Sequence, residues 1–257
     1  MGVIVIGITA LIASLLTFFS GFGLGTMLTP VFAVFFPAEI AVAQTSIVHF
    51  INNILKIFLI GKYINSKILF KFGIPATLGA IGGAIALVYF SKLSPITSYI
   101  ISENEFFITP IKLIIGIMII VFSVLEIFPG FSKNISIKDN LVMGGLLSGF
   151  FGGLSGHQGA LRSVFLIRFN LSKEEYVATG TGIAILIDLS RISLYVNFFF
   201  IGNVSNDFSF IAIGTACALT GALLGNYFLK KISIKFVQAI THLMLVLIGI
   251  GMASGLL

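Results

Sequence analysis

The stretch GGLSGHQG at residues 152–159 interrupts a long apolar run, and GFGLGT at residues 21–26 interrupts an earlier one. We call them the second break and the first break. Glycine inside a helix costs about 1 kcal/mol relative to alanine, so neither stretch is expected to continue as a regular helix. At membrane depth, non-helical backbone is tolerated only where protein buries it or water reaches it. Two such interruptions in corresponding halves of a chain are typical of a transporter binding site.

Composition places the whole chain in a membrane. Of its 257 residues 58% are hydrophobic and 9% are charged, with a mean hydropathy of +1.14. Soluble domains carry about 25% charged residues. The apolar runs are continuous, whereas a membrane β-barrel would show alternating segments of about ten residues. We therefore predict a polytopic helical protein, in which the uncharged N-terminus is a first membrane segment and not a cleaved signal peptide.

The apolar segments form two sets with the same lengths in the same order. The first set has arms at 3–20 and 25–36, then segments at 40–61, 68–90 and 107–128; the second has arms at 141–153 and 159–170, then segments at 175–200, 208–229 and 234–256. The predicted fold is an all-α polytopic membrane protein of two inverted repeats. Each repeat has about five hydrophobic segments and begins with a glycine-broken helical hairpin. Residues 1–130 form the first repeat, 131–140 the connecting loop and 141–257 the second repeat.

The distribution of basic residues favours hairpins over single crossings at the breaks. Lys and Arg concentrate on the cytoplasmic side of membrane proteins. If each break were part of one crossing, the basic residues would divide almost evenly between the two sides. If each is a hairpin, every loop Lys or Arg except Lys92 falls on one side. The hairpin topology gives halves of opposite orientation, with both termini extracytoplasmic.

Ionisable residues inside the predicted spans are candidates for function, because they are costly there. His49, Asn53 and Lys56 share one helix face, and Asp188 and Arg191 occupy the positions of Asn53 and Lys56 in the second repeat at an offset of 135. Three alternatives stay open. Asp188 and Arg191 could simply neutralise each other, Lys56 could extend to the inner interface, and His49 could pack uncharged.

The second break carries polar side chains of its own. His157 lies in the break and is expected to face an aqueous cavity, where protonation would strengthen anion binding as pH falls. The alternative is that His157 stays neutral and holds the loop through a backbone carbonyl. Arg162, one turn later, either points at the site or bonds a carbonyl.

No enzyme constellation is apparent, and we predict that the chain is not an enzyme. HExxH, GxSxG and P-loop motifs are absent, and the glycine clusters do not follow a soluble strand as a dinucleotide site requires. The spacing of Ser155, His157 and Asp188 does not support a triad. We expect no cofactor and no metal, since no cluster of carboxylates favours a metal cation.

The order of these features resembles the sulfite exporter TauE/SafE family of bacterial membrane permeases. The resemblance rests on the uncharged N-terminal run with its Gly-x-Gly-x-Gly pattern, on Pro30 after it, on AVAQTS at residues 41–46, and on the glycine cluster that returns at mid-chain. It implies a multi-pass protein of the cell (inner) membrane that transports small sulfur-containing anions such as sulfite or organosulfonates, usually outward. Where the family is commonly richer in glycine, this chain has Ser155, His157 and Gln158, which leaves the particular substrate and the direction open.

An anion also fits the physical character of the site. Helix N-termini present free N–H groups and a partial positive charge, and arms that start after Gly25 and Gly159 would point theirs at the hairpin tips. The predicted substrate-binding residues gather around these tips and the two charged helix faces: Gly23, Gly25, Thr26, His49, Asn53, Lys56, Ser155, Gly156, His157, Gln158, Gly159, Arg162, Asp188 and Arg191.

The sequence thus predicts a secondary carrier for a small anion, working by alternating access. One alternative is a proton- or cation-linked carrier of another small solute, in which His49, His157 and Asp188 bind protons. Another is a membrane partner subunit that delivers a sulfur compound to an enzyme. The expected partners are a small anionic substrate and the lipid bilayer, with no nucleic acid, and a homo-oligomer is compatible with the sequence.

Overall fold

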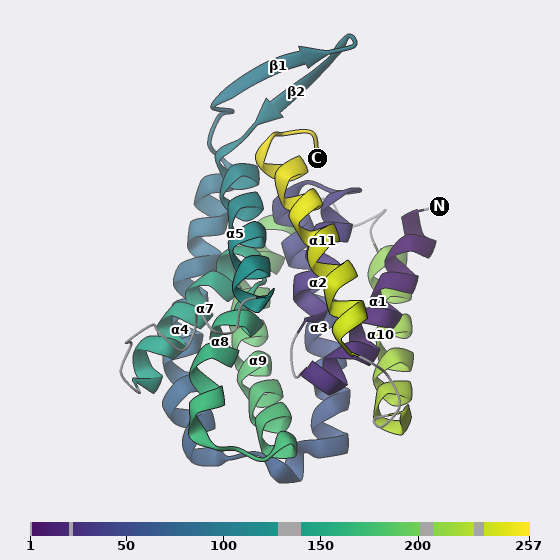
Figure 1. Cartoon of the computed structure of the whole chain (residues 1–257). Coiled ribbons are helices and arrows are strands. Elements are labelled where there is room, and N and C mark those ends of the chain that lie inside the picture. Colours follow the sequence, from purple (N-terminus) through teal and green to yellow (C-terminus); the bar gives the residue numbers. More distant parts are fainter. Residues whose placement is uncertain (1, 21–22, 128–139, 201–207, 229–233) are drawn as a thin grey trace.

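The computed structural model describes residues 2–20, 23–127, 140–200, 208–228 and 234–257 as a helical bundle with one β-hairpin at its end (Figure 1). The first half contains α1 (Gly2–Ser20), α2 (Leu24–Ala33), α3 (Ala38–Ile60), η1 (Gly61–Tyr63), α4 (Ser66–Ser91), β1 (Thr97–Ile101), β2 (Asn104–Ile108) and α5 (Pro110–Ile127). The second half contains α7 (Leu141–Ser155), α8 (Gln158–Leu166), η2 (Ile167–Phe169), α9 (Lys173–Tyr195), η3 (Val196–Phe200), α10 (Phe208–Phe228) and α11 (Ile234–Ala253).

Local sequence signals set where several helices begin. The side chain of Asn65 accepts a hydrogen bond from the Ile68 amide at the start of α4, and Asn140 accepts from two amides at the start of α7. Ser172 and Glu175 form a capping box at the start of α9. Each of these side chains satisfies amides that have no partner within their own helix. The bounds of the helices agree with the predicted segments to within a few residues.

The two halves interlock by exchanging helices. Helix α1 packs along α10, and α7 packs along α4, so the opening helix of each half lies on the fourth α-helix of the other. Helix α3 contacts α9, and α5 contacts α11. Figure 1 shows the α3–α4 and α8–α9 connections at the end of the bundle opposite the β-hairpin. Since α3 ends and α9 begins there, these two helices of 23 residues each run in opposite directions.

Small residues let α4 and α7 approach until their backbones touch. Gly145, Gly149 and Gly153 repeat every fourth residue on α7, and a Cβ on any of them would collide with backbone of α4 around Ala76 and Ala80. This spacing is the small-residue pattern by which membrane helices pack closely. In the other half, Gly221 of α10 lies in the same way against the backbone carbonyl of Leu11 in α1.

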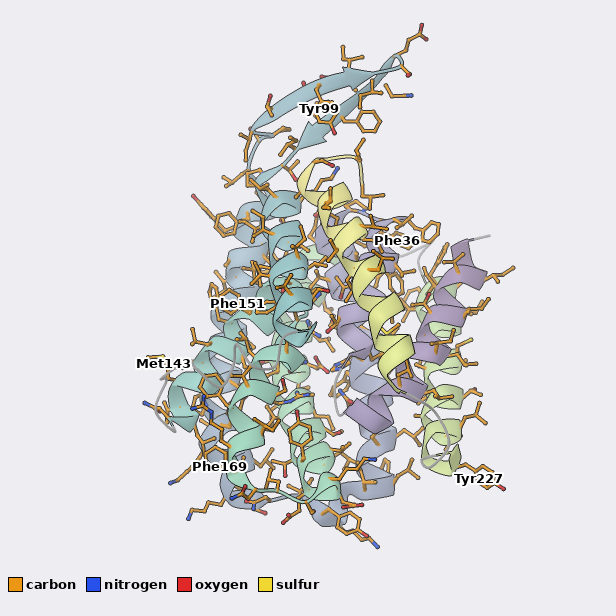
Figure 2. All side chains as sticks on the ribbon, viewed as in Figure 1. Phe36, Tyr99, Met143, Phe151, Phe169 and Tyr227 are labelled. Atoms are coloured by element: carbon orange, nitrogen blue, oxygen red, sulfur yellow. The ribbon has the colours of Figure 1, made fainter. Side chains whose placement is uncertain are left out.

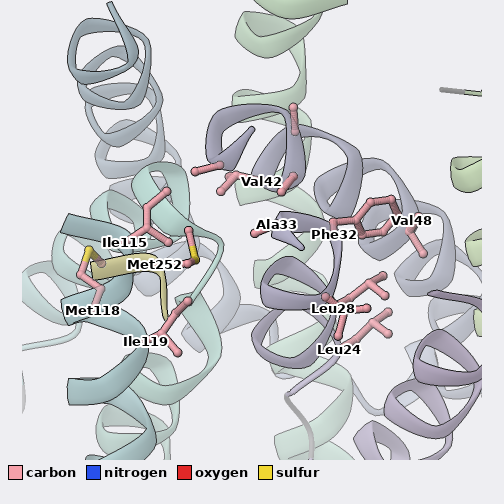
Figure 3. Close-up of a cluster of buried hydrophobic side chains, with 14 of the residues drawn as sticks. Leu24, Leu28, Phe32, Ala33, Val42, Val48, Ile115, Met118, Ile119 and Met252 are labelled. Carbon is pink, nitrogen blue, oxygen red and sulfur yellow. The ribbon is translucent and has the colours of Figure 1, made fainter. Parts of the chain in front are cut away.

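The main apolar core lies beside the breaks and joins the halves. Leu28 and Phe32 of α2 are fully buried with Val48 of α3, and Ile115 of α5 and Met252 of α11 belong to the same cluster (Figure 3). These contacts fix α2 between α3 and α11, and so hold the helix that follows the first break.

The outer surface of the bundle is apolar, as a lipid-facing surface should be. Phe58, Leu78 and Leu189 are more than half exposed. Among the described residues, four helices are long and apolar enough to cross a membrane: Ala38–Tyr63, Ser66–Ser91, Lys173–Phe198 and Phe208–Gly225. The arms α2 and α8 are 10 and 9 residues long, too short to cross a bilayer that needs about 20 residues.

The β-hairpin was not predicted, and it corrects the expectation of a helix that begins at residue 107. Strand β2 runs to Ile108, and the helix begins only at Pro110, which suits the first helical position. Ser102 and Glu103 have positive φ angles and form the turn. The hydroxyl of Tyr99 donates to the Ser254 carbonyl at 2.6 Å, which ties the hairpin to the end of α11 (Figure 2).

Candidate functional site

Both breaks end one helix and begin another. Helix α1 ends at Ser20 and α2 begins at Leu24, with Gly23 at φ 127° before it. Helix α7 ends at Ser155, and Gly156 follows with φ 82° in the left-handed region. Side chains other than glycine rarely adopt such angles, so glycine at these two positions permits the interruption. Gly21 and Phe22 of the first break lie outside the described residues.

The two breaks meet inside the bundle. A Cβ added to Gly25 would lie 3.0 Å from the Gly156 carbonyl oxygen and 3.9 Å from His49 Cδ2. A Cβ added to Gly156 would lie 3.0 Å from Thr29 Oγ1 and 3.5 Å from an Arg191 terminal nitrogen. The glycines thus bring the start of α2, the start of α8, and the central parts of α3 and α9 together.

Asp188 is the centre of the hydrogen-bond network at this meeting point. Its Oδ2 lies 2.6 Å from His49 Nδ1, which links α9 to α3 across the two halves. Its Oδ1 accepts from Arg191 Nε at 3.0 Å and Nη2 at 2.8 Å. Gln158 Nε2 of α8 donates to the same oxygen at 3.1 Å. Both carboxylate oxygens are therefore engaged, and the side chain is fully buried.

Arg191 also holds the end of α7. Its Nη1 donates to the Gly152 carbonyl at 2.9 Å, and one turn later the Tyr195 hydroxyl donates to the Gly153 carbonyl. Carbonyls in the last turn of a helix lack intrahelical partners. Tyr195 supplies a partner for Gly153, and Arg191 adds a second hydrogen bond to the Gly152 carbonyl, which also accepts from the Gly156 amide. The structure thus engages the Arg191 guanidinium in fixing the second break.

The interior holds more positive than negative charge. Among the side chains whose burial the structure describes, the charged ones that are buried are Asp188 and three cations: Lys56, Arg162 and Arg191. Lys56 is 4% exposed, so it does not extend to the interface as the alternative interpretation required. Arg162 packs on α9, its Nε 3.3 Å from where a Cβ on Gly180 would be.

The N-termini of α2 and α8 add partial positive charge. No side chain caps α2 at Gly23 or α8 at His157. Thr26 lies in the first turn of α2, and Gly159 in the first turn of α8, and both are buried. The first amides of these helices are the kind of group that binds anions.

The comparison with known families agrees with the apolar spans. The model of the family described as Sulfite exporter TauE/SafE matches residues 6–252. The chain belongs to the TauE/SafE family. It is therefore a multi-pass membrane protein of a transporter family. No curated protein and no solved structure matches the chain.

The environment of the His157 ring in this TauE/SafE chain differs from the prediction. The ring does not face water; it is fully buried and stacks on Phe122 with centroids 6.1 Å apart. Its Nδ1 lies 2.9 Å from the Ser155 carbonyl oxygen and 3.3 Å from the Ser155 hydroxyl. This is the geometry of the alternative, in which His157 holds the loop through a backbone carbonyl.

Three polar side chains near the breaks were missed from the sequence. Thr29, Gln44 and Thr45 are fully buried, and the hydroxyl or amide atoms of each have no hydrogen-bond partner among the described residues. The sequence contains a signal for two of them. Gln44 and Thr45 are polar residues inside the predicted membrane segment 40–61, and Thr45 lies one turn before His49. In the part of the chain that the structure describes, no three His, Cys, Asp or Glu residues gather as a metal-binding group.

Proposed function

We propose that this TauE/SafE chain is a secondary transporter for a small sulfur-containing anion such as sulfite or an organosulfonate, bound where the two breaks meet. The observation that carries the proposal is the excess of buried cations beside two helix N-termini. Removing an ion from water costs several kcal/mol even after relaxation, so a buried charge needs an opposite charge nearby. Among the side chains whose burial the structure describes, Asp188 is the buried carboxylate and Lys56, Arg162 and Arg191 are the buried cations. A bound anion would add a second negative charge to this region.

Alternating access is supported by the way the halves are built. Two repeats, 1–130 and 141–257, joined by 131–140, would account for the exchanged helices and for the opposite directions of α3 and α9. In inverted-repeat transporters, interrupted helices line a site near the midplane, and one part rocks against the other. Here the proposed site side chains are buried, as expected of a closed state between the two open ones.

We further propose that both termini are extracytoplasmic. Helix α1 begins and α11 ends at the end of the bundle that carries the β-hairpin (Figure 1). The opposite end carries Lys62, Lys67 and Arg168 in or beside the α3–α4 and α8–α9 connections. Basic loops favour the cytoplasm. With Cys217 replaced by alanine, Lys67→Cys should react with a membrane-impermeant thiol reagent from the cytoplasmic side and Glu103→Cys from outside. Labelling of both from one side would contradict this topology.

Transport by the purified protein tests the proposed function directly. We expect liposomes that contain the protein alone to exchange internal for external sulfite or a small sulfonate, and not to exchange a cation such as choline. Empty liposomes, and liposomes with a variant that folds but lacks Lys56, are the controls. Binding without flux by well-folded protein would instead support a partner subunit.

The contact between His49 and Asp188 favours a second, proton-linked version of the carrier. A histidine and a carboxylate 2.6 Å apart across the two halves can share a proton that either half could release. An imposed pH gradient should then drive anion accumulation in wild-type liposomes and not in His49→Gln liposomes. Equal accumulation with and without the gradient would exclude proton coupling.

A further inference from the structure

We propose that the transported anion also carries an O–H or N–H group. This group donates hydrogen bonds to acceptor atoms of His157 and Gln158. The ligand class is an acid monoanion or a hydroxy- or amino-substituted sulfonate, with hydrogen sulfite as its smallest member. This inference rests on the proposed anion carrier and specifies its substrate.

Gln158 presents an acceptor because its donor end is already fixed. Nε2 lies 3.1 Å from Asp188 Oδ1, and that carboxylate also accepts from Arg191. A carboxylate held by a guanidinium is ionised and only accepts hydrogen bonds, so the amide must direct its NH2 group at Asp188. The Oε1 atom is then directed elsewhere. It is buried and has no partner among the described residues.

His157 presents a second acceptor for the same kind of reason. A backbone carbonyl can only accept, so His157 Nδ1, at 2.9 Å from the Ser155 carbonyl oxygen, carries the proton. In the neutral ring Nε2 is then an unprotonated acceptor. This atom is also buried with no partner in the described part of the chain. The ring is fixed by its stacking on Phe122, which keeps Nε2 from turning to another group.

Two adjacent residues therefore offer buried acceptors in the second break, beside the uncapped N-terminus of α8. An unsatisfied buried acceptor costs about 1–3 kcal/mol. The first amides of α8 can only donate, and the Thr29 hydroxyl lies close to Gly156. The buried cations Lys56 and Arg162 are donors as well. A ligand that satisfies both sets has anionic oxygens at one end and an O–H or N–H at the other.

The experiment compares two ligands of the same shape. 2-Hydroxyethanesulfonate and 1-propanesulfonate share the sulfonate and differ by a hydroxyl in place of a methyl group. Binding to the purified full chain is measured by calorimetry at fixed pH. We expect the hydroxy compound to bind about tenfold more tightly or better, because the methyl compound leaves the acceptors unsatisfied.

Two variants of His157 form a matched pair for the same measurement. Asn places an amide nitrogen near the position of Nδ1 and loses the atom at Nε2, so His157→Asn should keep the Ser155 contact and lose most of the preference. The longer Gln side chain can place an amide oxygen at the position of Nε2. His157→Gln should therefore keep part of the preference for the hydroxy compound. Thermal unfolding of both variants reports whether they are folded.

The outcomes separate this inference from the proposed function. Equal binding of the two sulfonates by the wild type overturns the donor requirement and leaves the anion site intact; a charged His157 that donates through Nε2 would give this result. If neither sulfonate binds but sulfite does, sulfite should bind more tightly on the acid side of neutrality, where it carries a proton, and His157→Asn should remove that dependence. A pH dependence that persists in His157→Asn overturns the inference. If no sulfur anion binds, the proposed function itself fails.

Discussion

Helices α3 and α9 have the same length and correspond to each other in the proposed repeats, but they use their cations differently. In α9, Asp188 lies three residues before Arg191 and binds it through two N–H groups, and Arg191 in turn binds the end of α7. In α3 the corresponding residues are Asn53 and Lys56. The Asn53 amide nitrogen lies 3.1 and 3.4 Å from the ring nitrogens of His49, and the position before Lys56 that corresponds to Asp188 has no carboxylate.

This difference suggests a division of labour between equivalent positions. The ion pair of α9 is internally neutral and fixes the second break, which makes Arg191 a positioning residue. The lysine of α3 also brings a positive charge into the interior, and the residue three positions before it is Asn53 and not an acid. His49, whose counterpart is Ala184, connects the two arrangements through Asp188. On this view the first half provides the charge that attracts the anion, and the second half provides the geometry.

The largest effect should come from breaking the pair in α9. Arg191→Met leaves Asp188 buried without its guanidinium and removes the bond to Gly152. We expect a loss of roughly 3–5 kcal/mol in the free energy of unfolding, because a buried charge is left uncompensated. Denaturant unfolding in detergent measures it.

The double variant Asp188→Leu with Arg191→Met is the control for that loss. It removes both charges, so it should be less destabilised than Arg191→Met alone. A double variant as unstable as the sum of both single changes would show that the two residues act separately, and the contrast with α3 would lose its basis.

The next effect concerns Lys56 and should appear mainly in binding. Lys56→Met keeps a side chain of similar length and removes the charge. We expect anion affinity to fall about ten- to hundredfold, the equivalent of one hydrogen bond to a charged group, with no loss of folded protein. Lys71→Met, which changes an exposed lysine of α4, should leave the affinity unchanged.

Asn53→Asp sharpens the same comparison. It would install in α3 the acid that α9 already has, and so neutralise Lys56 from within its own helix. Anion affinity should then fall as it does in Lys56→Met. Unchanged affinity in both variants would place the binding charge elsewhere, with Arg162 as the remaining candidate.

Much of this fold could be predicted because membrane burial leaves a strong signal in the sequence. Long uncharged runs marked the helices, and glycine-dense stretches marked the breaks. The proposed equivalence of Asn53 and Lys56 to Asp188 and Arg191 rests on a constant offset of 135 and stays a prediction. The β-hairpin was missed because its apolar strands look like the start of the next helix, although Thr97, Tyr99 and Ile100 are residue types that favour strands.

The site was less predictable, because side-chain partners depend on packing that no spacing reveals. The sequence placed Asp188 and Arg191 on one helix face, but not His49 of α3 beside Asp188. It placed His157 in the break, but not against Phe122, whose position depends on how α5 packs. The sequence also does not reveal that polar atoms of Thr29 and Gln44 are buried without a partner among the described residues, because that depends on which helices pack around them.

A smaller effect should distinguish the glycines of the two breaks. Gly156 has a left-handed conformation, so Gly156→Ala should cost about 1–2 kcal/mol of stability from backbone strain alone. Gly25 lies in the first turn of α2, where alanine suits the backbone, but its Cβ would press on the Gly156 carbonyl oxygen at 3.0 Å. We expect Gly25→Ala to fold nearly normally and to weaken anion binding by displacing that carbonyl. Thermal unfolding and calorimetry on the two variants separate these effects, and a larger loss of stability in Gly25→Ala would show that the first break is the more constrained one.

The smallest effect should come from the β-hairpin, which lies between α4 and α5. Tyr99→Phe removes the hydrogen bond to the Ser254 carbonyl and keeps the ring that stacks on Phe106. A single neutral hydrogen bond contributes about 0.5–1.5 kcal/mol to stability, and this one is only partly buried, so the unfolding midpoint should fall slightly. The hairpin lies at one end of the bundle, where Tyr99 ties it to the end of α11 (Figure 1), so anion affinity and flux should stay at the wild-type value. A clear change in flux would mean that the tie between the hairpin and α11 takes part in the movement of the two halves. The comparison of α3 with α9 would then describe only part of the transport machinery.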